Sequence, residues 1–238
     1  MFEKKFILGV GFNNAPENLI LEYIVKSVKN LSEKYYIVTP NPELLVIAHN
    51  NIKYKRILNN AKLALPDGIG VILASKLLGK GMKGRITGVD LVNKLCEVVA
   101  EKPITVGFLG GGPGIADKTA ECLVEKYSGL KVILIQSGNP NESTVKLINK
   151  NIDILFVAFG SPKQELWISD NLERLPVKVA IGVGGAFDFI SGETRRAPVW
   201  IRNIGLEWLF RLIIQPWRWR RQVALAKFVF LVLKEKLF

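Results

Sequence analysis

The sequence has 238 residues, 49% of them hydrophobic, which is long enough to bury a substantial core and too apolar for a disordered protein. The net charge is +12, and because 195–238 carries ten basic against two acidic residues, only +4 remains for 1–194. Cys96 and Cys122 give neither a metal-binding spacing nor a disulfide framework, and no apolar run approaches the roughly 20 residues that cross a bilayer, so we expect a cytosolic protein without a secretion signal or membrane span.

Short β-branched runs alternate with longer segments of helical period over 1–194. Strands are predicted at 6–10, 35–38, 63–65, 104–109, 132–135, 154–159 and 179–183, with helices that include 16–31, 44–51, 115–127 and 162–175. This alternation predicts an α/β fold with a Rossmann-like, mostly parallel sheet and helices on both faces. The composition changes near Arg195, so we predict an α/β core over 1–194 and a C-terminal helical appendage over 195–238.

Polar or glycine-rich loops follow the predicted strands, at 39–41, 66–68, 110–114, 160–164 and 182–188. Open α/β sheets bind ligands at the carboxyl ends of their strands. Gly110 and Gly111 precede a predicted helix, so their backbone is placed to approach a phosphate, although a tight structural turn explains the same loop. Ile115 stands where a dinucleotide fingerprint needs a small residue, and there is no P-loop, which disfavours a dehydrogenase or a P-loop enzyme.

Asp67 is the most informative carboxylate of these loops. It lies between Pro66 and Gly68 directly after a predicted strand, a rigid position that suits a general base. A turn-forming aspartate explains the same triplet. Neutral hydrogen-bonding side chains follow neighbouring strands at Thr39, Asn41 and Gln164.

The second glycine cluster offers a different kind of contact. Gly184 and Gly185 allow backbone to approach a ligand, and Asp188 is placed either to accept hydrogen bonds from a base or ribose or to cap a helix. Ser161 has no base partner in the sequence, so we interpret it as a helix N-cap ahead of Pro162.

The appendage combines its basic residues with four of the five tryptophans. Such a mixture fits a phospholipid headgroup surface, and it also fits nucleic acid. Arg220, Lys227 and Lys234 are seven residues apart and share one helical stripe, while the rest of 223–233 is apolar. Eleven residues at about 1.5 Å each cannot cross a bilayer, so this helix either lies in the plane of the membrane surface or packs on the core or in an oligomer.

Eight motifs occur in the order found in the WecG/TagA/CpsF glycosyltransferases, and the sequence resembles that family over nearly its whole length. They are Thr-Pro-Asn at 39–41, Pro-Asp-Gly at 66–68, Arg-Ile-Thr-Gly-Val-Asp at 85–90, Phe-Leu-Gly-Gly at 108–111, Ser-Pro-Lys-Gln-Glu at 161–165, Gly-Val-Gly-Gly-Ala-Phe-Asp-Phe at 182–189, Arg-Arg-Ala-Pro at 195–198 and Gly-Leu-Glu-Trp-Leu-Phe-Arg-Leu at 205–212. The resemblance implies an inverting transfer of N-acetylmannosamine from UDP to GlcNAc-diphospho-undecaprenol, which begins the wall teichoic acid linkage unit. A relative that uses N-acetylmannosaminuronic acid or a hexose in polysaccharide synthesis is the alternative.

The resemblance also implies roles for individual residues. Asp67 matches the proposed base. Thr39, Asn41 and Gln164 match positions near the sugar and catalytic centre. The positions expected to bind substrate are Asp188, Gly184, Gly185, Gly110, Gly111 and Arg85. Arg211, Arg218 and Arg221 match arginines that fold over the active site.

No Asp-x-Asp metal motif is present, so we expect neither a metal nor another cofactor. The three arginines are then expected to neutralise the departing diphosphate. The expected partners are a UDP-sugar, the polyprenol-diphosphate-GlcNAc lipid, an anionic membrane surface on the cytoplasmic side of a bacterial cell membrane and a second copy of the chain in solution. Binding of nucleic acid by the basic appendage is the alternative of another class, and we do not expect it.

Overall fold

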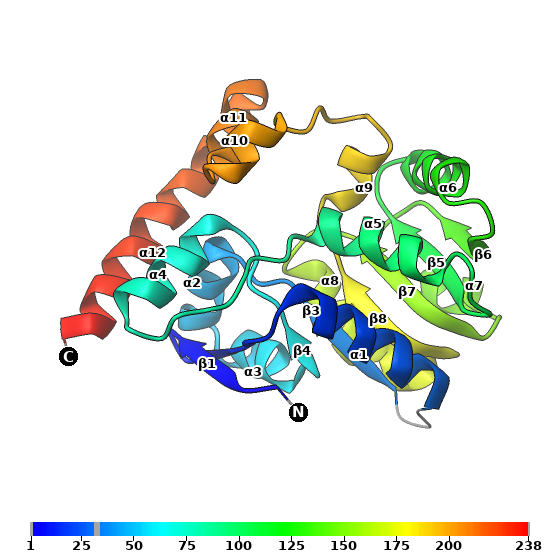
Figure 1. Cartoon of the computed structure of the whole chain (residues 1–238), viewed down its shortest axis with the longest axis horizontal. Coiled ribbons are helices and arrows are strands. Elements are labelled where there is room, and N and C mark those ends of the chain that lie inside the picture. Colours follow the sequence, from blue (N-terminus) through cyan, green and yellow to red (C-terminus); the bar gives the residue numbers. More distant parts are fainter. Residues whose placement is uncertain (1, 31–33, 238) are drawn as a thin grey trace.

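The computed structural model describes residues 2–30 and 34–237, and within these ranges six strands form one parallel sheet (Figure 1). The strand order is β4-β3-β8-β7-β5-β6, and every neighbouring pair is parallel. The strands are β3 (Tyr35–Val38), β4 (Leu63–Ala64), β5 (Thr105–Gly110), β6 (Lys131–Gln136), β7 (Ile152–Ala158) and β8 (Val177–Gly182). The central strand β7 is buried on both faces, as Leu155 and Phe156 show, because helical crossovers cover both sides of a parallel sheet.

Helices cover the two faces of the sheet and enclose two hydrophobic clusters. One cluster contains side chains from α1 (Glu17–Asn30), α5 (Gly88–Val99), α6 (Ile115–Lys126) and α9 (Ala186–Ile190). The other draws on α2 (Pro42–Asn50), α3 (Ile52–Asn60), α4 (Ile69–Leu77), α7 (Glu142–Leu147), α8 (Lys163–Asn171) and the 3-10 turn η1 (Leu172–Arg174). The predicted α/β class with helices on both faces is confirmed.

The strand predicted at 6–10 is wrong. Two short antiparallel strands, β1 (Lys4–Ile7) and β2 (Val10–Asn13), form a separate hairpin there. Leu8 and Gly9 make the turn with φ angles of 51° and 78°, the left-handed pair that a two-residue hairpin requires. A leucine rarely adopts this conformation, so the apolar run hid the turn.

The appendage consists of α10 (Val199–Asn203), α11 (Glu207–Ile214), the 3-10 turn η2 (Pro216–Arg218) and α12 (Trp219–Leu237). Figure 1 shows α12 alongside α4 and α2. One face of α12 joins the core, because Phe228, Leu231 and Val232 are buried in the second cluster. The last turn is fixed by Glu235, which accepts a hydrogen bond from the Leu8 backbone (2.7 Å) and pairs with Lys80 (2.6 Å).

Packing on the core therefore accounts for one face of α12 and leaves the other to solvent. Val223, Phe230 and Leu233 are among the exposed apolar residues of that outer face. The described part of the chain holds no helix with the length and apolarity to cross a membrane. The division of the chain at Arg195 remains a prediction from composition.

Candidate active site

A cavity of about 1200 Å³ lies at the carboxyl ends of the strands, between the sheet and the appendage. It is lined by most of the predicted site residues, namely Thr39, Asn41, Asp67, Arg85, Gly111, Gln164, Gly184, Gly185, Asp188 and Arg211. The side chains of Arg218 and Arg221 lie outside the described part of the structure. Chain segments far apart in the sequence thus meet at one edge of the sheet, as expected for a parallel α/β fold.

Gly110 does not line the cavity. Its φ angle is 108°, and a Cβ atom placed on it would lie 2.7 Å from the carbonyl carbon of Ala158. The position requires glycine because β5 leaves the sheet tightly against the end of β7. The geometry therefore supports the structural explanation of Gly110 over the predicted phosphate contact, while Gly111 faces the cavity.

Asp67 lies in a turn that backbone hydrogen bonds hold from both sides. Its own N–H donates to the Pro40 carbonyl (3.1 Å), and the carbonyl of Pro66 accepts from Ile86 N (3.0 Å). Burial raises the pKa of Asp67 to about 7, the negative charge of Glu207 adds to the rise, and the Arg85 guanidinium opposes it. A carboxyl group with this pKa is suited to accept a proton at neutral pH.

Thr39 and Asn41 are positioned by the ends of β3 and α2. Thr39 Oγ1 donates to the Gly182 carbonyl (3.2 Å), which ties the exit of β3 to that of β8. Asn41 Oδ1 accepts from Leu44 N (3.1 Å) and so caps α2. The Asn41 amide nitrogen is the part of that side chain that capping does not use.

Gln164 is buried and braces the second glycine loop. Its Oε1 accepts from Gly184 N (3.0 Å), and its Nε2 donates to Ser161 Oγ (3.1 Å) and Glu165 Oε1 (2.7 Å). The geometry gives Gln164 a positioning role, since both ends of its amide are hydrogen-bonded to protein.

Glu165 is a buried carboxylate that our sequence interpretation did not single out. Besides Gln164, it accepts from Ser161 Oγ (2.7 Å) and from the Tyr54 hydroxyl (3.1 Å), and burial raises its pKa. The prediction of Ser161 as an N-cap is wrong, because its hydroxyl bonds this carboxylate and the N-cap position of α8 is Pro162. Because Glu165 is buried, its carboxylate oxygens need hydrogen-bond donors, and the Ser161 hydroxyl supplies one of them.

The glycine loop of β8 meets the appendage at Gly185. A Cβ atom there would lie 3.2 Å from both Asp188 Oδ2 and Arg211 Nη2, so a side chain would enter the space between the carboxylate and the guanidinium. The Arg211 guanidinium lies over the Phe189 ring, 4.6 Å from its centroid, and Arg211 Nε donates to Gln215 Oε1 (3.2 Å). Arg211 of α11 is thereby held beside the loop predicted to bind nucleotide.

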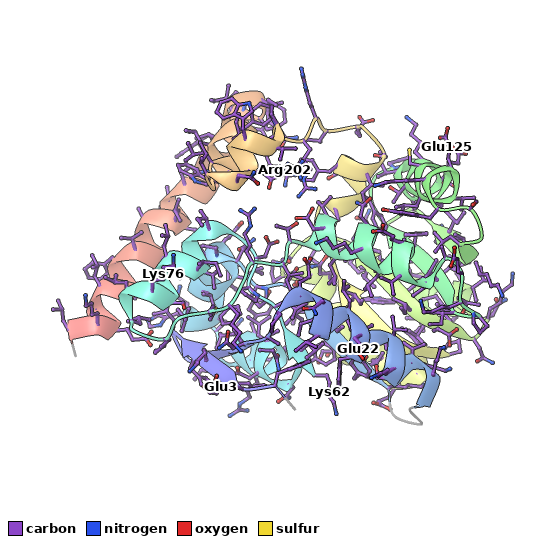
Figure 2. The ribbon with its side chains drawn as sticks, in the orientation of Figure 1. Glu3, Glu22, Lys62, Lys76, Glu125 and Arg202 are labelled. Atoms are coloured by element: carbon purple, nitrogen blue, oxygen red, sulfur yellow. The ribbon has the colours of Figure 1, made fainter. Side chains whose placement is uncertain are left out.

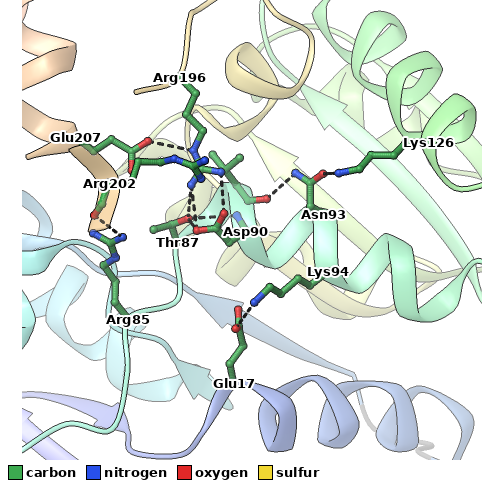
Figure 3. Close-up of polar contacts among 11 residues, drawn as sticks. Glu17, Arg85, Thr87, Asp90, Asn93, Lys94, Lys126, Arg196, Arg202 and Glu207 are labelled. Atoms are coloured by element: carbon green, nitrogen blue, oxygen red, sulfur yellow. Dashed lines mark hydrogen bonds and ion pairs between the residues drawn. The ribbon is translucent and has the colours of Figure 1, made fainter. Parts of the chain in front are cut away.

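Arg196 joins the appendage to the core through a network of charged side chains (Figure 3). Its guanidinium forms two hydrogen bonds with Asp90 (2.7 and 3.0 Å), and its Nε donates to Glu207 Oε1 (3.1 Å). Burial acts to raise the pKa of Asp90, yet hydrogen bonds from Arg196 and Thr87 hold it below its usual value. These residues lie within the motifs at 85–90, 195–198 and 205–212, but only the fold shows that they pair.

Arg85 makes a second connection at the same border. Its Nη2 donates to the carbonyl of Arg202 (3.3 Å), and Arg202 lies on the side of the appendage that faces the core (Figure 2). Arg85 thus contacts the appendage while lining the cavity near Asp67.

Among the described residues, no three His, Cys, Asp or Glu side chains are arranged to hold a metal ion.

The sequence model of the glycosyl transferase WecG/TagA/CpsF family matches residues 6–238. The chain belongs to this family. It is therefore a glycosyltransferase, and the resemblance inferred from the eight motifs is confirmed.

Relatives with the same name support this assignment. The N-acetylglucosaminyldiphosphoundecaprenol N-acetyl-beta-D-mannosaminyltransferase of Bacillus spizizenii is 37% identical over 204 residues, 84% of this chain and 79% of the relative. The enzyme of that name from Bacillus subtilis is 31% identical and covers 97% of this chain and 91% of its own. A Staphylococcus aureus relative, also so named, is 30% identical over 97% of this chain and 92% of its own.

Proposed function

We propose that this enzyme transfers N-acetylmannosamine from UDP to the GlcNAc of GlcNAc-diphospho-undecaprenol, with inversion at the anomeric carbon. The names of the relatives supply the sugar and the acceptor. The observation that carries the proposal is the placement of Asp67, with a pKa of about 7, in one cavity with Arg211 and Asp188. One carboxylate to accept a proton and a cation to receive a departing phosphate are what this chemistry needs.

In the proposed reaction, Asp67 takes the proton of an acceptor sugar hydroxyl as its oxygen attacks the anomeric carbon of the donor. The bond between that carbon and the β-phosphate oxygen breaks, and its electron pair leaves with UDP. Arg211 neutralises the charge that develops on the diphosphate, because a guanidinium offers paired hydrogen bonds to phosphate oxygens. Asp188 and the backbone at Gly184 and Gly185 face the nucleotide.

Transfer without a metal ion is part of this proposal. Arg211 stands at the glycine loop, where a bound metal would otherwise balance the diphosphate charge, and Arg218 and Arg221 are proposed to add to it. Activity that is unchanged in EDTA is the expected result. Loss of activity in EDTA with recovery on adding Mg²⁺ or Mn²⁺ would overturn this part.

We also propose that the enzyme docks peripherally on the cytoplasmic face of the cell membrane. The acceptor is a lipid, and the appendage exposes Trp200, Ile213, Trp217 and Phe230. Exposed aromatic and apolar residues next to basic ones favour a headgroup interface. Salt-sensitive binding to an oligonucleotide with none to anionic liposomes would instead favour a nucleic-acid partner.

The deciding assay offers a panel of UDP-sugars together with GlcNAc-diphospho-prenol and measures UDP release. UDP-N-acetylmannosamine is expected to react fastest, and the product linkage is expected to be opposite in anomeric configuration to the donor. Preference for UDP-N-acetylmannosaminuronic acid or a UDP-hexose would replace the donor and keep the reaction class. Absence of transfer from every UDP-sugar would reject the proposed function.

A further inference from the structure

The lining of the active-site cavity includes an apolar trough, although Glu43 of α2 and Gln222 of α12 line the same cavity. Its walls are two helical stripes, Ile69, Leu73 and Leu77 on α4 and Leu225, Val229 and Val232 on α12. We call these six residues the apolar trough. Leu73 and Val229 are 56% and 50% exposed, so the trough presents large apolar side chains to the cavity space.

The floor of the trough is closed by tight packing between three helices. Phe228 of α12 is buried, and a Cβ atom on Gly70 would lie 2.8 Å from the Pro42 ring and 3.9 Å from both Leu225 and Phe228. Glycine at position 70 lets α2, α4 and α12 come together beneath the trough. Any occupant must therefore lie along the helices, since the floor leaves no way through to the core.

The trough begins beside the candidate catalytic base. Ile69, its first residue, is two positions after Asp67, and the Gly205 turn of the appendage sits against Ile69, where a Cβ would approach to 2.6 Å. Arg85 lines the cavity here, and its positive charge acts on Asp67. A molecule that extends along the trough thus places its head at Asp67 and Arg85.

The chemistry of the trough excludes the polar parts of both substrates as its occupants. Its six side chains carry no hydrogen-bonding group, so a nucleotide, a sugar or a diphosphate placed there would lose its water without compensation. An isoprenoid chain gains free energy in the same place through burial of its surface. Continuity with Arg85 adds that this chain ends in a phosphate group.

We infer that the apolar trough binds the first isoprene units of the acceptor's polyprenyl chain, with its diphosphate at Arg85 and its GlcNAc at Asp67. The inference rests on the proposed function, because that function supplies a lipid-linked acceptor. Membrane docking by the outer face of the appendage is a separate property, since Phe230 and Leu233 of that face do not line the cavity.

The test uses the full chain without membranes and three acceptors, GlcNAc-diphosphate esters of methyl, geranyl and farnesyl alcohol. Transfer is measured as UDP release from UDP-N-acetylmannosamine, below the concentration at which the acceptors form micelles. We expect kcat/KM to rise by about tenfold or more from methyl to farnesyl, mainly through KM, since each buried methylene strengthens binding severalfold.

Matched variants separate the trough from the rest of the appendage. Leu73→Gln and Val229→Gln place a polar group in the trough, and the ratio of kcat/KM for farnesyl over methyl is expected to fall toward one. Val223→Gln and Leu233→Gln change exposed apolar residues of α12 outside the cavity and are expected to keep the wild-type ratio. Circular dichroism and thermal melting are the checks that all four variants fold, which is expected for exposed positions.

Three results would overturn the inference. Equal kcat/KM for the three acceptors would remove the trough as a chain-binding site and leave the proposed function standing. Trough variants that keep the farnesyl preference but lose liposome binding would assign the trough to bilayer lipid. Absence of transfer to any acceptor would reject the proposed function and with it this inference.

Discussion

The two walls of the cavity are built in different ways. The sheet wall presents Thr39 and Asp67 from strand ends and Gln164 from the first turn of α8, and each is held by hydrogen bonds to backbone of the α/β core. The appendage wall presents Glu207 and Arg211 from α11. Arg211 lies over Phe189 of the core, and Glu207 pairs with Arg196, which in turn binds Asp90 of the core. The candidate base thus lies on a wall held by backbone hydrogen bonds, whereas the arginine proposed to receive the diphosphate lies on a wall held through side-chain contacts.

Removing the base tests the sheet wall and should have the largest effect. Asp67→Asn keeps the size of the side chain but cannot accept the proton, so turnover is expected to fall by about 10²–10⁴-fold. Binding of UDP measured by calorimetry should stay within a few-fold of wild type. Turnover within tenfold of wild type would show that another group is the base.

Disturbing the brace of the sheet wall should have the next largest effect. Glu165→Gln replaces an acceptor of three hydrogen bonds with an amide whose NH₂ faces donors, so we expect the free energy of unfolding to fall by about 1–3 kcal/mol. Chemical denaturation measures this. Since Gln164 holds Gly184, KM for the UDP-sugar should rise as well, and a loss of stability with unchanged KM would separate Glu165 from the glycine loop.

Cutting the contact between the walls should act on the appendage alone. Arg196→Ala leaves Asp90 and Glu207 without their shared partner, and we expect about 1–2 kcal/mol weaker docking, because these groups are only partly buried. Faster proteolysis and hydrogen exchange over 195–215, with the sheet unchanged, is the measurement. Lys26→Ala, which breaks an exposed pair with Glu22, is the control and should change neither.

The pH dependence of kcat/KM probes how the appendage wall tunes the sheet wall. As the proposed base, Asp67 acts in its ionised form, and its pKa is about 7, so kcat/KM is expected to fall as pH drops below 7. Glu207→Gln removes a negative charge and should move this limb to lower pH, whereas Arg85→Gln should move it to higher pH. Limbs that coincide with wild type would show that the two walls are electrostatically independent.

The same shift has a consequence for stability. The pKa of Asp67 in the folded protein lies above its usual 3.8. The contribution of protonated Asp67 to the free energy of unfolding is therefore fully present below about pH 4 and is lost as pH rises through 7. The Asp67→Asn variant has no carboxyl group to ionise and does not lose this stability. The free energy of unfolding of the variant minus that of wild type should therefore be greater at pH 8 than at pH 4. Denaturation curves at the two pH values compare them.

Sequence periodicity predicted the parallel sheet and the loops that carry the site, because strand ends and their polar residues are local signals. Pairs distant in sequence were not predictable in the same way. Arg196 and Asp90 lie 106 residues apart, and Tyr54 and Glu165 lie 111 apart, so no spacing rule connects them. The turn at Leu8 was missed because a left-handed leucine leaves no signal in composition.

The appendage is a second case in which the sequence did not determine which residues contact each other. The sequence of α12 is apolar around most of its circumference, which fits both membrane contact and burial on the core. Which residues turn inward depends on the shape of α2 and α4, and the fold selects Phe228, Leu231 and Val232. Composition thus predicted a helix with an apolar surface but not which of its apolar residues face the core and which face solvent.

The bond from Leu8 N–H to Glu235 joins residues 227 positions apart, so it forms only when synthesis of the chain has reached its last helix. Until then the hairpin lacks this partner, and α4 and α2 lack α12 beside them. A shortened polypeptide that ends before α12 therefore loses part of the interior along with the exposed face of that helix. Point substitutions on the outer face, such as at Phe230, separate attachment to lipid from completion of the fold.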